Sequence, residues 1–213
     1  MPNQAYIVVE GVIGVGKTTL ARLLGGVFKS GVVLEAVEEN PFLGEFYADR
    51  ARYAFQTQVF FTLNRYRQQN ELAAITRGVV SDYLFAKNTL FARLNLRGDE
   101  LALYQTLYDV LAERVRRPDL VIYLQASLPV LQARIIQRDR PFERDMDWDY
   151  IAAVRDAYES LFASYTQSPV LPIETDRLDL VRDRAALAYV AGLVRAALAG
   201  YRQQGLDFDG SGD

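Results

Sequence analysis

The segment from residue 8 to residue 19, VVEGVIGVGKTT, has the glycines, lysine and threonines of a phosphate-binding loop. It fits the pattern G-x-x-x-x-G-K-[ST], in which glycines let backbone N–H groups surround phosphate oxygens. We predict that Lys17 reaches the outer phosphates of ATP and that Thr18 ligates the Mg²⁺ ion that bridges them. The alternative is a glycine turn that binds nothing. The residues predicted to hold the donor phosphates in this loop are Gly11, Gly14, Val15, Gly16, Lys17, Thr18 and Thr19.

A general base in this protein must be a carboxylate, because the chain contains no histidine and no cysteine. Their absence also excludes thiolate metal sites, disulfides and imidazole catalysis. Glu35 is the best candidate, since it follows a short predicted strand and open sheets bind ligands at the carboxyl ends of their strands. It could accept a proton from an attacking hydroxyl. We expect Glu38 and Glu39 to form a solvated acidic turn instead.

A polar row runs along a predicted helix that is otherwise rich in aromatic residues. Gln58, Thr62 and Arg65 are spaced i, i+4, i+7, so they lie on one face over about 10 Å. Gln58 can donate and accept hydrogen bonds at once, as a base edge requires, and Arg65 can donate a fork to a carbonyl oxygen or ring nitrogen. A row that simply faces solvent is the other interpretation, and spacing leaves the two open.

Three arginines stand around the end of another predicted helix. Arg134 and Arg138 share a helix face, and Arg140 follows just before Pro141. Converging cations suit a transferring phosphoryl group, whose charge is spread over its equatorial oxygens. We interpret residues 138–147 as an arginine-rich lid that closes over a nucleotide. The alternative is a surface helix neutralised by nearby acids, namely Asp139, Glu143 and Asp145.

Apolar strands alternate with helical patterns along the chain, which predicts an α/β fold with a five-stranded, mostly parallel sheet flanked by helices. The predicted strands are Tyr6–Glu10, Val32–Leu34, Val79–Val80, Leu120–Leu124 and Val170–Ile173. The predicted helices are Lys17–Phe28, a broken stretch from Asn40 that includes Tyr53–Thr76, Leu101–Val115, Pro129–Gln137, Trp148–Tyr165 and Arg182–Tyr201. We expect one domain over residues 1–204 and a disordered tail over residues 205–213.

The overall charge argues against binding of a nucleic-acid polymer. The chain has 24 basic and 27 acidic residues and a net charge of -3, so no global positive field attracts a phosphate backbone. No apolar segment is long enough to cross a bilayer, and the N-terminal residues do not resemble an export signal. These features predict a cytoplasmic protein.

With these motifs the chain resembles the deoxynucleoside kinases, and within them the bacterial purine branch typified by deoxyguanosine kinase. The resemblance implies that Glu35, in the stretch EAV, deprotonates the sugar 5'-hydroxyl, although Ala36 replaces the usual proline. It implies that Tyr47 and Glu143 hold the 3'-hydroxyl. By the same resemblance Gln58 and Arg65 bind the base, and the arginines Arg134, Arg138 and Arg140 contact the donor nucleotide. It further implies a homodimer formed through helices, for which the apolar faces of Leu72–Ile75 and Leu101–Leu111 are candidates; burial of these faces in the core is the alternative.

The chain departs from the family pattern in one place. Most members carry [DE]-R-[ST] after the third strand, where the arginine supports the catalytic glutamate, whereas this chain reads VVSDYLFAKN. We interpret this as a mark of the branch. Asp82 is then a candidate magnesium ligand in the nucleoside site, and its alternative is a helix-capping aspartate.

These predictions describe a P-loop kinase that transfers the γ-phosphoryl group of Mg-ATP to the 5'-hydroxyl of a purine deoxynucleoside, with deoxyguanosine favoured over deoxyadenosine. The predicted catalytic residues are Glu35, Lys17 and Arg138. Two alternatives remain open: a nucleoside-monophosphate kinase, and a catalytically silent nucleotide-binding scaffold subunit.

Overall fold

The computed structural model describes residues 4–72, 75, 77–144 and 146–206. Its centre is a five-stranded sheet in which every neighbouring pair is parallel, with the strand order β2-β3-β1-β4-β5. The strands are β1 (Tyr6–Gly11), β2 (Gly31–Val33), β3 (Val79–Ser81), β4 (Leu120–Gln125) and β5 (Val170–Glu174). The α/β fold and the parallel sheet predicted from the sequence are therefore confirmed.

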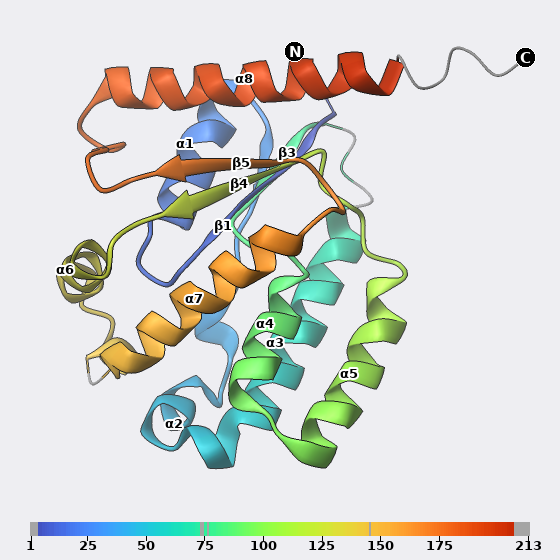
Figure 1. The fold of residues 1–213 in the computed structure, drawn as a ribbon, viewed down its shortest axis with the longest axis vertical. Helices are drawn as coiled ribbons and strands as arrows, with labels where there is room; N and C mark the ends of the chain where they lie inside the picture. Colours follow the sequence, from blue (N-terminus) through green and yellow to red (C-terminus); the bar gives the residue numbers. More distant parts are fainter. Residues whose placement is uncertain (1–3, 73–74, 76, 145, 207–213) are drawn as a thin grey trace, which may run out of the picture.

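Helices cover both faces of this sheet. Figure 1 shows α1 and α8 on one side, and α3, α4, α5 and α7 on the other. Their bounds are α1 (Lys17–Phe28), α2 (Leu43–Ala48), α3 (Arg50–Leu72), α4 (Lys87–Asn95), α5 (Gly98–Ala112), α6 (Leu128–Arg138), α7 (Trp148–Ser164) and α8 (Arg184–Leu206). Two short 3₁₀ turns, η1 (Val37–Glu39) and η2 (Pro141–Glu143), lie before α2 and after α6.

The structure corrects several predicted boundaries. Helix α4 entered the prediction only as the helix that Asp82 might cap from Leu84 onward; it begins later, at Lys87, after Ala86 and without a side-chain cap. Helix α3 ends at Leu72, and Ile75 is already outside it, although the helical pattern was extended to Thr76. Helix α8 continues to Leu206, two residues into the segment predicted to be disordered. The rest of that segment, 207–213, lies outside the described residues.

The central strand shows why the sheet forms a buried layer. All six residues of β1 are buried, because β3 and β4 flank it and helices cover both faces. Ile7 and Val9 join a core cluster that includes Leu20 of α1, whereas Tyr6 and Val8 join a second cluster that includes Leu72 of α3. This alternation places successive side chains on opposite faces of the sheet. Among the described residues, no helix combines the length and the apolarity that crossing a membrane requires.

The topology gathers three segments at one edge of the sheet. After β1 the chain returns through β2 and β3 on one side of that strand, and then crosses to β4 on its other side. The segments that follow β1, β2 and β3 carry the phosphate loop, Glu35 and Asp82. Parallel strands end at the same edge, so these groups meet at the change of direction, where open sheets bind ligands.

Candidate active site

The phosphate loop is held open by its glycines. Gly11 has φ 146°, and a Cβ atom there would lie 2.4 Å from the carbonyl oxygen of Leu124, so only glycine fits beside β4. Gly16, with φ 107°, begins α1 without a side-chain cap. The first N–H groups of α1 are therefore left for a ligand, and the helix dipole favours an anion there.

Lys17 lies within the curve of this loop. Its Nζ donates to the carbonyl oxygens of Gly11 at 2.7 Å and Val12 at 3.0 Å. Burial, together with the neighbouring charge of Lys87, lowers the pKa of Lys17 to about 8. An anion in the loop would stabilise the charged ammonium, because opposite charge favours the ionised form. The role of Lys17 toward the outer phosphates stays a prediction.

Asp82 connects the phosphate loop to the segment after β2. Its Oδ2 accepts a hydrogen bond from the Thr18 hydroxyl, and its Oδ1 accepts one from the backbone N–H of Glu35 at 2.7 Å. Burial raises the pKa of this carboxyl. The helix-capping alternative is wrong, since α4 begins only at Lys87 and its cap residue is Ala86.

The Thr18 and Asp82 oxygens form a donor set that suits magnesium. Among the described residues no cluster of three or more acids could hold a metal by itself. Mg²⁺ nevertheless needs only one or two protein carboxylates when substrate phosphates and waters complete its shell. A hydroxyl and a carboxylate already in contact at the phosphate loop therefore fit an ion that arrives with a nucleotide.

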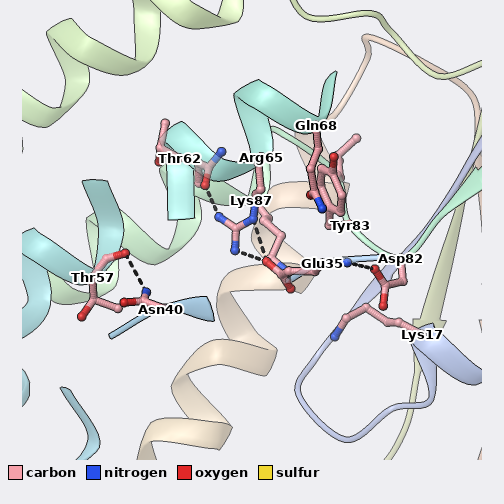
Figure 2. A network of polar contacts seen from close by, with 12 residues as sticks. Lys17, Glu35, Asn40, Thr57, Thr62, Arg65, Gln68, Asp82, Tyr83 and Lys87 are labelled. Atoms are coloured by element: carbon pink, nitrogen blue, oxygen red, sulfur yellow. Dashed lines mark hydrogen bonds and ion pairs between the residues drawn. The ribbon is translucent and has the colours of Figure 1, made fainter. Parts of the chain in front are cut away.

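Glu35 is held by two cations (Figure 2). Arg65 donates to Oε1 through Nε at 2.7 Å and through Nη2, while Lys87 donates through Nζ to Oε2 at 2.9 Å. The Glu35 side chain is 11 % exposed, against 5 % for Arg65 and 4 % for Lys87. Burial alone would raise the pKa of Glu35, but the two cations outweigh it and lower the pKa to about 2. The carboxylate is therefore ionised.

The polar row on α3 is buried. Gln58, Thr62 and Arg65 are 3 %, 0 % and 4 % exposed, so the solvent-facing interpretation is wrong. Thr62 shares a hydrogen bond with the hydroxyl of Tyr104, and Arg65 also donates to Asn88. Gln58 lines the cleft described below. Arg65 thus contacts Glu35, and its predicted contact with a base stays a prediction.

The predicted lid region places Glu143 at its centre. Arg138 donates to both carboxylate oxygens of Glu143, with Nη2 at 2.6 and 2.7 Å, and Arg140 lies 3.8 Å away. Glu143 does neutralise Arg138, as the surface alternative supposed, but it is buried at 5 % exposure. Phe142 stacks on Tyr47, with ring centroids 6.1 Å apart. Burial raises the pKa of the Tyr47 hydroxyl, which keeps it a neutral hydrogen-bond donor.

Arg134 has a different position from the one expected of a phosphate ligand. Its Nη1 donates to the Val15 carbonyl oxygen at 3.2 Å and to the Thr175 hydroxyl at 2.9 Å, and its Nη2 donates to the Thr175 carbonyl oxygen at 2.7 Å. In this structure Arg134 therefore anchors the phosphate loop to the end of β5. A direct phosphate contact stays a prediction.

These groups line one cleft of about 1100 Å³, larger than the space that one small ligand needs. Gly11 and, in the polar row of α3, Thr62 do not line it; the other predicted site residues do. Glu38 and Glu39, expected in a solvated turn, are exposed at its rim. Sequence reasoning missed further lining residues, among which are Lys87, Tyr158, Thr175 and the segment 178–182. A lysine inside the apolar run YLFAKNTLF was the available signal for Lys87, since lysine is rarely buried without a partner.

A parallel sheet whose phosphate loop shares a cleft with a buried acid and several arginines defines a kinase of the P-loop class. The chain belongs to the deoxynucleoside kinase family, which it matches over residues 7–197. It is an enzyme of that kind.

Relatives with assigned activities support this family membership. The chain is 33 % identical over 203 residues to a deoxyguanosine kinase of Bacillus subtilis (strain 168), covering 92 % of this chain and 98 % of the relative. It is 34 % identical over 174 residues to a deoxyadenosine kinase of Dictyostelium discoideum, covering 79 % and 71 %. A solved deoxyadenosine kinase from M. mycoides with bound dATP has the same fold, with a TM-score of 0.80, 20 % identity, and coverage of 90 % of this chain and 100 % of that one.

Proposed function

We propose that this kinase transfers the γ-phosphoryl group of ATP to the 5'-hydroxyl of a purine deoxynucleoside, with deoxyguanosine preferred, and yields the 5'-monophosphate for cytoplasmic nucleotide salvage. The observation that carries the proposal is the shared cleft of the phosphate loop and Glu35, connected through Asp82. A donor phosphate in the loop and an acceptor hydroxyl at Glu35 would then be neighbours. The similarity to a deoxyguanosine kinase over nearly the whole chain supports guanine as the preferred base.

The proposed reaction uses these residues in distinct roles. Glu35 accepts the proton of the 5'-hydroxyl while the 5'-oxygen forms a bond to the γ-phosphorus. The bond from that phosphorus to the β,γ-bridging oxygen breaks, and its electron pair leaves with ADP. Lys17 and Arg138 offset the charge on the moving group. Thr18 and Asp82 would hold Mg²⁺ with the ATP, where it would neutralise phosphate charge.

The remaining cleft residues form the proposed nucleoside site. Tyr47 and Glu143 bind the 3'-hydroxyl, a role that suits a neutral phenol beside a buried carboxylate. Gln58 binds the base edge. Arg65 gives up part of its contact with Glu35 and donates to the base instead. The donor phosphates contact residues 14–19, Arg138 and Arg140, and Arg134 supports the loop or reaches them directly.

A coupled assay of ADP release with a panel of deoxynucleosides and their monophosphates tests the proposal. We expect turnover with deoxyguanosine, less with deoxyadenosine, and none with monophosphates, because an acceptor phosphate would lie beside the Glu35 carboxylate. Turnover with a monophosphate alone would establish a nucleoside-monophosphate kinase. Nucleotide binding without turnover on any acceptor would establish a silent subunit.

Replacing Gln58 with alanine is expected to weaken deoxynucleoside binding about 10-fold or more, because the buried base edge loses the hydrogen bonds of the Gln58 amide. ATP binding should change little, since Gln58 lies on α3 and not on the phosphate loop. Calorimetric titration with each ligand measures both affinities. Gln105 is a matched control, since it pairs with Asp109 on α5 away from the cleft residues, and Gln105→Ala should leave both unchanged. An equal loss for nucleoside and ATP in Gln58→Ala would indicate that Gln58 only supports the helix.

We also propose a homodimer formed through α5. Leu103 and Val110 are spaced i, i+7 and are 62 % and 64 % exposed, so they lie on one apolar face of α5 that the protomer leaves uncovered. Leu72, part of the other candidate face, is 1 % exposed and belongs to the core, which removes it from the proposal.

The double substitution Leu103→Asp and Val110→Asp is expected to convert a dimer into a monomer, because it places two charges in the apolar contact. Sedimentation equilibrium measures the mass. Val27→Asp on α1, another exposed apolar position, is the control and should leave the dimer intact. A dimer that survives the double substitution would exclude this face as the interface.

A further inference from the structure

The first residue of α4 carries a buried cation that the proposed mechanism does not yet use. Lys87 is 4 % exposed, and its ammonium group lies 2.9 Å from Oε2 of Glu35. Among the described residues Glu35 is the only acid within ion-pair distance of Lys87. The Phe91 ring lies 5.8 Å from Nζ, and Lys87 also interacts electrostatically with Lys17 and Asp82. A buried lysine is costly unless it is paired, and Glu35 is the carboxylate that Lys87 contacts directly.

Charge balance alone does not require Lys87. Arg65 already supplies one positive charge to Glu35 and is held in place by its second contact, to Asn88. One cation is enough to neutralise one carboxylate, so the second must do something that the first does not. The difference lies in which oxygen each cation holds.

Arg65 and Lys87 divide the two oxygens of Glu35. Both Arg65 contacts, from Nε and Nη2, go to Oε1, whereas Lys87 contacts Oε2. A guanidinium fork normally prefers to hold both oxygens of a carboxylate at once. In this site Oε2 is bonded to Lys87, so Arg65 does not hold both oxygens. The Asp82 carboxylate accepts a hydrogen bond from the backbone N–H of Glu35 and so fixes its backbone. The carboxylate is thereby held in one rotamer.

The neighbouring sequence gives no other side chain for this task. Tyr83, directly after Asp82, is buried with 0 % exposure and carries no positive charge that could contact Glu35. Lys87 reaches Glu35 from five residues beyond Asp82 because α4 begins there and packs against α3, the helix that carries Arg65. Figure 2 shows Lys87 and Arg65 both directed at Glu35.

We propose that Lys87 is a positioning residue for the general base: it holds Oε2 of Glu35 toward the acceptor site and prevents Arg65 from rotating the carboxylate into a fork. The inference rests on the proposed role of Glu35. It predicts that Lys87 acts on the chemical step through Glu35 and not on nucleoside binding.

The test compares Lys87→Met, Lys87→Arg, Glu35→Gln and the double variant Glu35→Gln with Lys87→Met. In Lys87→Met we expect kcat to fall about 10-fold or more, part of the 10²–10⁴ that a positioned base contributes. The dissociation constant of the nucleoside, from calorimetry, should stay within about 3-fold. Lys87→Arg should restore most of the lost kcat, since it returns a cation to Oε2. Lys29→Met, which removes an exposed lysine directly after the C-terminal end of α1, is the control and should behave as wild type.

The double variant separates positioning from general structural support. If Lys87 acts through Glu35, the double variant is no slower than Glu35→Gln alone, because coupled residues are non-additive. A full additional loss in the double variant, an unchanged kcat in Lys87→Met, or a Lys87→Arg variant as slow as Lys87→Met would each overturn the proposal. If Lys87→Met does not fold, the test rests on the kcat of Lys87→Arg, which should keep most of the wild-type value. Failure of the proposed function itself would be distinct, since wild-type protein would then show no turnover with any nucleoside.

Discussion

Replacing Glu35 with glutamine is expected to lower kcat by about 10²-fold or more, the usual contribution of a general base. Glutamine keeps the shape of the side chain but cannot accept the proton of the 5'-hydroxyl. The Asp82 contact to the backbone of residue 35 does not depend on the side chain, so the segment should keep its place. The affinity for nucleoside should therefore stay within several fold of wild type.

Steady-state ADP release measures the loss, and calorimetry with deoxyguanosine measures the affinity. Glu45→Gln is a matched control, because Glu45 is exposed on α2 and does not line the cleft. Unchanged turnover in Glu35→Gln would remove Glu35 from its role as base. Loss of both turnover and binding would instead assign it to nucleoside recognition or to support of Arg65 and Lys87.

Arg138→Met is expected to lower kcat by about 10²-fold, because a cation that faces the transferring phosphoryl group stabilises charge that develops in the transition state. Arg138 lines the same cleft as the phosphate loop and is 36 % exposed there, so it can reach a ligand. Its pairing with Glu143 also connects it to the proposed 3'-hydroxyl site. An acceptor without a 3'-hydroxyl should then show a smaller kcat penalty for the substitution than deoxyguanosine does.

Single-turnover measurements with saturating ATP separate this loss from weaker donor binding. Arg144→Met is the control within the same segment, since Arg144 pairs with the exposed Asp139 and does not line the cleft. Equal effects of the two substitutions would mean that the segment needs positive charge in general. A wild-type rate in Arg138→Met would show that its Glu143 pairing is purely structural.

Several parts of this site could be predicted from the sequence because neighbouring residues encode them. The phosphate loop needs glycines at fixed spacing, an apolar strand before it and a helix after it, and all of these lie within residues 6–28. Glu35 and Asp82 follow the apolar residues of β2 and β3, so the parallel-sheet rule places both acids at one edge. The helical spacing of Gln58, Thr62 and Arg65 likewise predicted their common face.

Only the tertiary structure decided which partners these side chains have. Glu35 and Lys87 are 52 residues apart, and Glu35 and Arg65 are 30 apart. Their contacts depend on how α3 and α4 pack together at the end of β2, which no local pattern encodes. The same is true of Arg134, which contacts Thr175 across 41 residues. The sequence by itself therefore determined the phosphate loop, the candidate base and the layered fold, because these follow from local spacing and hydrophobic period. The ion pairs that orient the base follow from distances between elements, and those exist only once the chain has folded.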